Sequence, residues 1–198
     1  MAFLDSGEGI GGMSPEGAEH IAAVIELGGP MHDEAMNAMK ALQQRFGIDF
    51  ILNGAAAPHI MLSSGRCGDA GAVVESLRSA LADTGPFDLT ADGLGIFVRE
   101  TPVVHVRWRA TDELAALQRA CASTLARSCQ EQGAYTSPVE WQAKATLAFN
   151  DISYVQLSDV LEVLRTFDFT QVMRVEHVAV HRIETARDSV LARIGLNG

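Results

Sequence analysis

Ala57-Pro58-His59-Ile60-Met61-Leu62 is a short apolar segment with a single basic side chain in it. Its length and apolar character, with a glycine following at position 65, are typical of a buried strand. Side chains alternate between the two faces of a strand, so His59, Met61 and Ser63 should share one face. The segment therefore predicts a strand that presents an imidazole on one side.

A second segment of the same kind, Ala143-Lys144-Ala145-Thr146-Leu147, lies in the other half of the chain. Alternation places Lys144 and Thr146 on one face of this strand. If the two strands meet at the floor of a cleft, their polar faces form a small basic pocket in an acidic protein. An alternative is that Lys144 lies on an edge strand, where a charged side chain hinders pairing with other sheets.

The composition describes an acidic chain of ordinary globular character. Its 198 residues carry a formal net charge of −10, with 47% hydrophobic and 20% charged residues. This length is enough for one domain with a sizeable core. The negative charge argues against bulk nucleic-acid binding, which depends on basic patches that neutralise phosphates. A local site for one small phosphorylated or nucleotide ligand remains compatible with it.

No segment is typical of a membrane protein or of a secretion signal. No apolar run approaches the ~18 residues of a membrane span. Residues 1–13 lack the basic start and the long apolar core of a signal peptide. Cys67, Cys121 and Cys129 are odd in number and unclustered, so we expect reduced thiols in a cytoplasmic protein. No motif indicates a cofactor, and the oligomeric state stays open.

The rest of the chain predicts one α+β domain between two tails. Residues 1–18 are glycine-rich and should be flexible. Their G-x-G-x-x-G match at residues 7–12 lacks the flanking strand and helix of a dinucleotide site. Hydrophobic spacing predicts helices over 31–46, 69–83, 111–130 and 158–164, and strands over 20–27, 48–52, 58–64, 87–98, 102–109, 144–149, 167–172 and 174–183. Residues 19–184 then form two pseudo-symmetric lobes around a central cleft, each an antiparallel sheet with outer helices. The tail over 185–198 adds a helical turn or two.

The Pro58–Leu62 segment, with a strand and a helix before it and two strands over 87–109 after it, resembles the first half of the 2H phosphoesterase superfamily. This group contains 2′-5′ RNA ligase-like proteins and cyclic nucleotide phosphodiesterases, and its signature is two copies of His-x-Thr/Ser. The second copy corresponds to Lys144-Ala145-Thr146, and the resemblance covers residues 19–184. It implies a metal-independent enzyme without cofactor. One histidine acts as general base, the other protonates the leaving oxygen, and the two hydroxyls hold the phosphate.

Each motif copy departs from the family pattern at one position. The first has Met61 where the family has a hydroxyl, and the second has Lys144 where the family has histidine. A lysine near its ordinary pKa of ~10.4 is protonated at neutral pH, so it can donate a proton but cannot accept one. The resemblance therefore implies that His59 is the base and Lys144 the acid or electrostatic partner, with Thr146 and Ser63 as phosphate-binding hydroxyls.

His105 and Arg107 share one face of the strand expected over 102–109. If that face lines the cleft, Arg107 can supply the phosphate contact that Met61 cannot, because a guanidinium suits oxyanions. His105 is then a second group that titrates near neutral pH. The alternative is a solvated sheet face that binds no ligand.

His177 and His181 raise the separate question of a metal site. On a helix, a spacing of four residues brings two histidines to one face, as in known metal motifs. The alternating pattern of residues 177–181 favours a strand instead, where the two side chains lie ~13 Å apart and cannot share an ion. We therefore expect no metal site, and we expect both histidines to be exposed or hydrogen-bonded.

The sequence supports two functions of different classes. The first, implied by the resemblance, is a phosphoesterase acting on a cyclic phosphodiester or a 2′-5′-linked nucleotide. Losing the charge-assisted donor at Met61 typically costs ~1.5–3 kcal/mol, so this enzyme should be weak or altered. The second is a non-catalytic module that binds a phosphorylated small molecule or nucleotide in the same cleft. Both require His59 and Lys144 to lie on adjacent strands and to face the same side.

Overall fold

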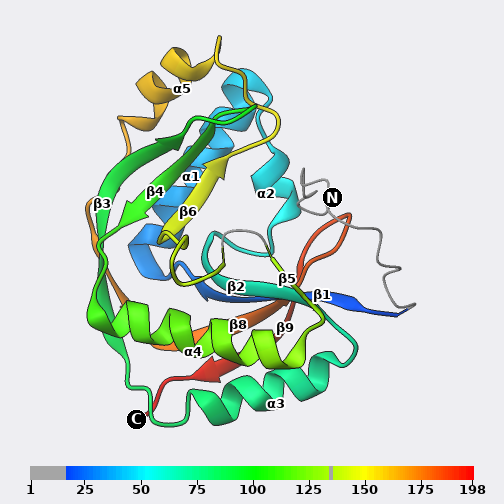
Figure 1. Cartoon of the computed structure of the whole chain (residues 1–198). Coiled ribbons are helices and arrows are strands. Elements are labelled where there is room, and N and C mark those ends of the chain that lie inside the picture. Colours follow the sequence, from blue (N-terminus) through cyan, green and yellow to red (C-terminus); the bar gives the residue numbers. More distant parts are fainter. Residues whose placement is uncertain (1–16, 134–135) are drawn as a thin grey trace.

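One antiparallel sheet organises the chain, and the helices pack against one of its faces (Figure 1). The computed structural model describes residues 17–133 and 136–198. In chain order the elements are β1 (Glu19–Glu26), α1 (Gly29–Phe46), α2 (Phe50–Gly54), β2 (His59–Cys67), α3 (Ala70–Ala80), β3 (Phe87–Phe97), β4 (Val103–Trp108), α4 (Asp112–Ser128), β5 (Glu131–Gln132), β6 (Lys144–Ala148), α5 (Leu157–Leu164), β7 (Val172–Val175), β8 (His177–Arg182) and β9 (Ser189–Gly195). The expected flexible tail and the glycine motif at 7–12 lie essentially outside the described residues.

The sheet joins the two halves of the chain. Its strand order is β7-β3-β4-β6-β2-β1-β8-β9, with β5 beside β2. Strands β7, β3, β4 and β6 form one side, and β2, β1, β8 and β9 form the other, with a strong curl between them (Figure 1). The two sides meet where β2 pairs with β6 through Ile60 and Ala145. The expected α+β fold, with antiparallel strands and outer helices, is confirmed.

The main hydrophobic core lies between the sheet and the helices. Ile60 of β2 and Val106 of β4 are completely buried there, against residues such as Leu42 of α1 and Leu117 of α4. The opposite face of the sheet carries a second, smaller cluster, made of Ala22, Val24, Ala179 and Ile183, with Met61 packed against it. Because strand side chains alternate, β1 contributes to both clusters.

Local sequence sets the helix boundaries. The hydroxyl of Thr111 accepts a hydrogen bond from the backbone N–H of Leu114 at 3.2 Å and so caps α4, as expected for this residue type. Helix α1 ends at Gly47, whose backbone lies in the left-handed region with φ of 70°. None of the described helices is long and apolar enough to cross a membrane.

Some expected elements are wrong. Residues 50–54 form helix α2 rather than a strand over 48–52, because an apolar run this short does not reveal its period. The expected helical turns within 185–198 are instead strand β9, which pairs along the whole of β8. The strand expected over 167–172 starts only at Val172, where β7 pairs with β3. In these segments, contacts with other parts of the same chain determine the conformation more than the local sequence does.

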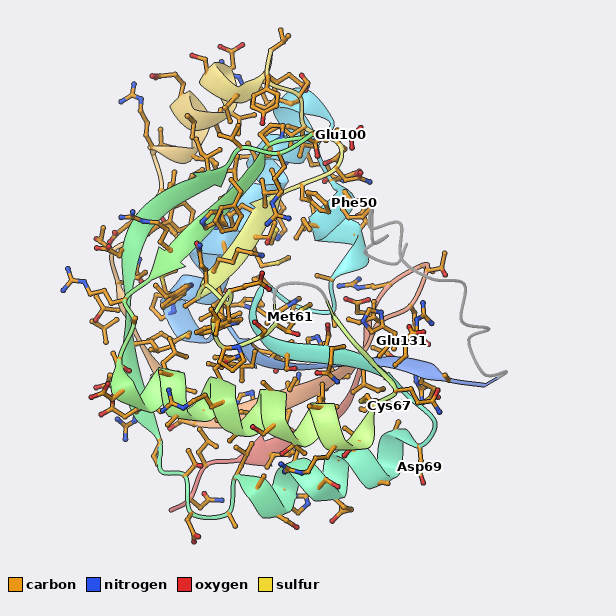
Figure 2. All side chains as sticks on the ribbon, viewed as in Figure 1. Phe50, Met61, Cys67, Asp69, Glu100 and Glu131 are labelled. Carbon is orange, nitrogen blue, oxygen red and sulfur yellow. A yellow bond between two sulfur atoms is a disulfide. The ribbon has the colours of Figure 1, made fainter. Side chains whose placement is uncertain are left out.

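Cys67 and Cys129 form a disulfide, so the expectation of reduced thiols is wrong for these two residues. After α4 the chain returns alongside β2, where Glu131 pairs with Arg66. This return brings Cys129 to the end of β2 that carries Cys67, and Figure 2 shows Cys67 and Glu131 at that end. Cys121 is a free thiol buried in the main core.

Candidate active site

His59 and Lys144 lie on adjacent strands and on the same face of the sheet. Strands β2 and β6 are antiparallel neighbours, and Ile60 pairs with Ala145 at their contact. Both paired residues are buried in the main core, so the residues beside them in each strand point to the opposite face. The edge-strand alternative for Lys144 is wrong, because β6 lies between β4 and β2.

The two motif segments are related by an approximate twofold symmetry about that contact. Their antiparallel register sets His59 beside Thr146 and Met61 beside Lys144. The ammonium of Lys144 donates a hydrogen bond to the Thr146 hydroxyl at 3.4 Å. Three polar groups therefore gather on one side, whereas the thioether of Met61 packs against the second apolar cluster.

Strand β4 extends the same face. In the register of β4 and β6, His105 pairs with Thr146 and Arg107 pairs with Lys144. We use the name site face for the face that carries His59, Met61, Lys144, Thr146, His105 and Arg107. The register thus places these two β4 residues beside the second motif strand, while their contact with a phosphate stays a prediction.

The two β4 residues differ in their surroundings. His105 is only 3% exposed, and its ring lies against Phe97 with 4.3 Å between ring centroids. Arg107 is exposed and forms an ion pair with Asp92 at 3.1 Å. The alternative of a solvated face therefore describes Arg107 but not His105.

Ser63 is separated from solvent. It is completely buried, and its hydroxyl has no hydrogen-bond partner among the described residues. Strand β2 has a bulge here, since Val24 pairs with Met61 while Ala23 pairs with Ser63. Ser63 thus has no exposed surface through which to contact a phosphate in this conformation.

The imidazole of His59 is oriented by its own backbone. Its Nδ1 lies 2.8 Å from the carbonyl oxygen of Ala57, which can only accept, so Nδ1 carries the proton and Nε2 the lone pair in the neutral ring. Burial lowers the pKa of His59 to about 4. The bond to Ala57 opposes this shift, and the charges of His181 and Lys144 add to it. At neutral pH, His59 is therefore a neutral base.

Two other site-face groups have lowered pKa values. Burial lowers the pKa of Lys144 to about 8, and the nearby charge of Arg99 acts in the same direction. Burial also lowers the pKa of His105 to about 4 and outweighs the hydrogen bond to Val103, which acts in the opposite direction; the charges of Lys144 and Arg107 lower the pKa further. The face thus combines neutral imidazoles with an amine that is mostly protonated at pH 7 but titrates unusually near neutrality.

Residues of β3 complete this face, although sequence analysis did not single them out. The Phe97 ring lies 5.9 Å from the Lys144 ammonium and 5.6 Å from the Arg99 guanidinium. Gly95 pairs with His105, and a side-chain carbon at Gly95 would overlap the Nε2 atom of that histidine. The alternation of β3 was the available signal, since Gly95 and Phe97 fall on one face.

Glu26 binds both histidines of β8. His177 Nε2 and His181 Nε2 lie 3.2 and 3.1 Å from the two different oxygens of this carboxylate, and Arg193 binds both oxygens. The expectation that the histidines are hydrogen-bonded is met, and both bind the same carboxylate. Within residues 17–133 and 136–198, no three His, Cys, Asp or Glu side chains form a group that could hold a metal ion.

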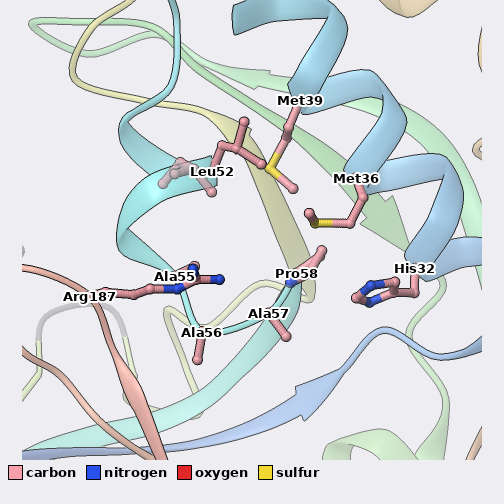
Figure 3. A pocket seen from close by; sticks show the side chains of 10 residues that line it. His32, Met36, Met39, Leu52, Ala55, Ala56, Ala57, Pro58 and Arg187 are labelled. Atoms are coloured by element: carbon pink, nitrogen blue, oxygen red, sulfur yellow. The ribbon is translucent and has the colours of Figure 1, made fainter.

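Two cavities lie at the end of the sheet where β2 begins. A cavity of about 180 Å³ has an apolar lining that includes Met36, Met39 and Pro58, with His32 and Arg187 at opposite sides (Figure 3). A cavity of about 330 Å³ is lined by Glu26 and His177 together with the start of α1 and residues of β7. Neither of these two cavities includes His59 or Lys144 in its lining.

The fold is shared with solved structures. The crystal structure of E. coli LigT complexed with 3′-AMP has a TM-score of 0.62 and 20% identity, covering 91% of this chain and 99% of that chain. TT0787 of Thermus thermophilus has a TM-score of 0.62 and 17% identity, covering 90% and 98%. A further structure described as a phosphoesterase has a TM-score of 0.59 and 20% identity, covering 91% and 99%. At these identities the likeness concerns the fold alone.

The sequence itself matches a family model. No curated protein matches the chain. The model of the 2′-5′ RNA ligase superfamily matches residues 32–187, which is more than half of the chain and includes both motif strands. The resemblance to the 2H phosphoesterases is thereby confirmed, and this chain belongs to the 2′-5′ RNA ligase superfamily.

Proposed function

We propose that this protein is a metal-independent phosphoesterase that hydrolyses a cyclic phosphodiester or a 2′-5′-linked nucleotide. The observation that supports this most is the gathering of His59, Lys144 and Thr146 on one face of two adjacent strands. A small phosphorylated ligand is further supported by the family, because E. coli LigT has been solved with 3′-AMP, ATP and NADP+.

In this proposal His59 is the general base. Its Nδ1 proton is engaged by the Ala57 carbonyl, so the Nε2 lone pair is available to a water molecule. With a pKa of about 4, the ring is neutral throughout the physiological range. A weakly basic imidazole accepts a proton only as the oxygen–phosphorus bond forms, which is the situation of general base catalysis.

Lys144 is the general acid. As the water oxygen attacks phosphorus and gives its proton to His59, the bond from phosphorus to the ribose oxygen breaks, and the Lys144 ammonium protonates the departing oxygen. A pKa of about 8 makes this ammonium a much better proton donor than an ordinary lysine, and still leaves it mostly protonated at pH 7. The two groups return to their starting states by proton exchange with water.

The remaining site-face groups hold the phosphate. Thr146 lies between His59 and His105, and its hydroxyl can donate to a non-bridging oxygen. Arg107 contributes positive potential from β4, although its ion pair with Asp92 keeps its side chain engaged. We assign no contact to Ser63 in this conformation, because its side chain is completely buried.

One observation favours the alternative, a binding module without catalysis. Met61 occupies the position related to Thr146 by the local symmetry, and it packs against the apolar cluster instead of offering a hydroxyl. The phosphate is then held by a hydroxyl from one side only. A ligand held in this way binds without the second contact that steadies it for in-line attack.

Turnover of 2′,3′-cyclic nucleotides and 2′-5′ dinucleotides without added metal tests the proposal. The wild type is compared with His59→Ala, Lys144→Ala and the control Lys40→Ala, which changes an exposed lysine on α1. General acid and base groups typically contribute 10²–10⁴-fold, so turnover should fall by roughly that factor in the first two variants and remain in the control.

Each result assigns a function. Loss with His59→Ala alone removes Lys144 from the proposed chemistry and directs the search for the second group to His105 and Arg107. No turnover of any substrate by the wild type rejects the enzyme. A rise in melting temperature on adding the same nucleotides would then identify the binding module, because a ligand that binds only the folded state stabilises it.

The oxidation state of the cysteines in the cell tests the compartment in which the protein resides. Sequence analysis favours the cytoplasm, whereas disulfides such as Cys67–Cys129 are rare in reducing cytosol. We propose the cytoplasm, where cellular reductants would open the Cys67–Cys129 bond, and labelling of thiols in intact cells tests this. Labelling of Cys67 and Cys129 supports the cytoplasm, and labelling restricted to Cys121 after denaturation rejects it.

A further inference from the structure

Glu26 is a buried carboxylate directly beside the proposed base. It is the last residue of β1 and pairs with His59, the first residue of β2. Its side chain is 8% exposed, and it accepts hydrogen bonds from Arg193, His177 and His181. Burial alone would raise the pKa of Glu26, but these bonds outweigh it and lower the pKa to about 2. Glu26 is therefore an ionised carboxylate at neutral pH, and it can only accept hydrogen bonds.

His181 links this anion to His59. It is completely buried on β8, and its Nε2 must carry the proton that it donates to Glu26. Its ring stands almost perpendicular to the His59 ring, at 76°, with 5.4 Å between centroids. Strand β1 separates β8 from β2, and His181 pairs with Ala22 of β1.

The proposed function leaves one property of His59 unexplained. The bond to Ala57 sets the tautomer as long as it is formed, but it does not by itself stop the ring from rotating away from that carbonyl, after which both tautomers become accessible. A second, rigid neighbour is needed to hold the plane of the ring. His181 lies in the required position. Glu26 fixes the orientation of the His181 ring, because a carboxylate that accepts hydrogen bonds from Arg193 on both oxygens cannot rotate away from it.

We propose that Glu26 and His181 are positioning residues. Glu26 fixes the orientation of the His181 ring through their hydrogen bond. The His181 ring in turn keeps the His59 imidazole in the orientation in which Nδ1 donates to Ala57 and Nε2 points toward the substrate. The inference deepens the proposed function and rests on the role of His59 in it. His177 provides an internal comparison. It donates to the same carboxylate, yet among the described ring contacts only His181 meets His59.

The state of the His59 ring can be measured without substrate. Nitrogen-15 NMR of labelled protein at pH 7 distinguishes the Nδ1–H from the Nε2–H tautomer, and free histidine in water prefers the latter. The wild type and His177→Gln should show His59 as Nδ1–H. Glu26→Gln and His181→Ala should show a mixture of tautomers with broadened signals. His181→Phe, which restores a ring without a donor, should recover the Nδ1–H signal in part.

Turnover should follow the same order. We expect kcat to fall by about 10- to 100-fold in Glu26→Gln and His181→Ala with little change in KM. Displacing a reacting group by about 1 Å has effects of this size. His177→Gln should keep wild-type kcat, and His181→Phe should fall between. A purely structural role would lower the melting temperature in these variants and leave the tautomer and kcat unchanged.

The two readouts separate failure of this inference from failure of the proposed function. If the wild type turns over no substrate, the enzyme is rejected, and the NMR comparison still decides whether Glu26 and His181 position His59. The inference is overturned if folded His181→Ala keeps the Nδ1–H tautomer of His59, or if His177→Gln disturbs it as much as His181→Ala does.

Discussion

Replacing Lys144 by methionine should stabilise the protein while removing its proposed acid. Burial lowers the pKa of Lys144 from 10.5 to about 8, so the folded state disfavours the charged amine. The difference of 10.5 − 8, or 2.5 units, corresponds to about 3.4 kcal/mol at 1.36 kcal/mol per unit. Loss of the hydrogen bond to Thr146 and of the contact with Phe97 subtracts about 1 kcal/mol or less each. We expect a net gain of about 1–2 kcal/mol in the free energy of unfolding at pH 7.

This gain should depend on pH with a definite sign. Between pH 8 and 10.5 the unfolded chain keeps a proton on Lys144 that the folded chain has lost, so wild-type stability rises with pH in this window. Lys144→Met lacks this rise, and its advantage over the wild type should vanish toward pH 10. Burial raises the pKa of Cys121 to about 12, which acts in both proteins and cancels in the difference.

Urea unfolding followed by far-ultraviolet circular dichroism at pH 7 and pH 9.5 measures both effects. Lys40→Met is the matched control, because Lys40 is the other lysine of the chain and is exposed on α1. It should change neither stability nor pH dependence by more than about 0.5 kcal/mol. A less stable Lys144→Met at pH 7, or a difference that does not vary with pH, would refute burial as the cause of the lowered pKa.

Three further outcomes are expected. The rate of cyclic phosphodiester hydrolysis should rise with pH as His59 loses its proton near pH 4 and fall as Lys144 loses its proton near pH 8; a rate that stays level to pH 10 contradicts Lys144 as the acid. Gly95→Ala should lower the free energy of unfolding by about 1–3 kcal/mol in thermal or urea unfolding, because the added methyl overlaps His105; unchanged stability would mean that this ring has room to move. Denatured protein should expose only the Cys121 thiol to Ellman's reagent until the disulfide is reduced, and reduction should destabilise the fold by about 2–4 kcal/mol; three thiols before reduction would contradict the bond.

The motif strands could be predicted from the sequence because each obeys a local rule. The segments around His59 and Lys144 are apolar, short and bounded, and alternation gives the face of His59, Met61, Lys144 and Thr146 correctly. It fails at Ser63, because the bulge in β2 pairs Ser63 with Ala23 of the main core, whereas Met61 pairs with Val24 of the second cluster. Their pairing followed from the family resemblance and not from periodicity. The prediction for Phe50–Gly54 failed because so short an apolar run does not show a period. The prediction for β9 failed because its pairing with β8 outweighs a weak helical pattern.

The groups that surround His59 could not be predicted, because they depend on strand order. Glu26 reads as the acidic end of a buried strand, and only the placement of β1 between β2 and β8 brings it to His59 and to His181. The pKa of Lys144 depends likewise on burial beside Phe97 and on the charge of Arg99, which the chain order does not reveal. Such effects arise from tertiary contacts, and a single sequence contains no local signal for them.

The two motif strands, β2 and β6, are joined by a much shorter ladder than β1 and β2. In the described ladders these strands share the Ile60–Ala145 pair alone, whereas β1 and β2 pair along their whole length. A hydrogen bond of 2.7 Å from the Trp141 indole to the Met61 carbonyl ties the halves beside it. The two halves of the sheet that carry the proposed base and the proposed acid are therefore joined at this point by one strand pair and one side-chain hydrogen bond.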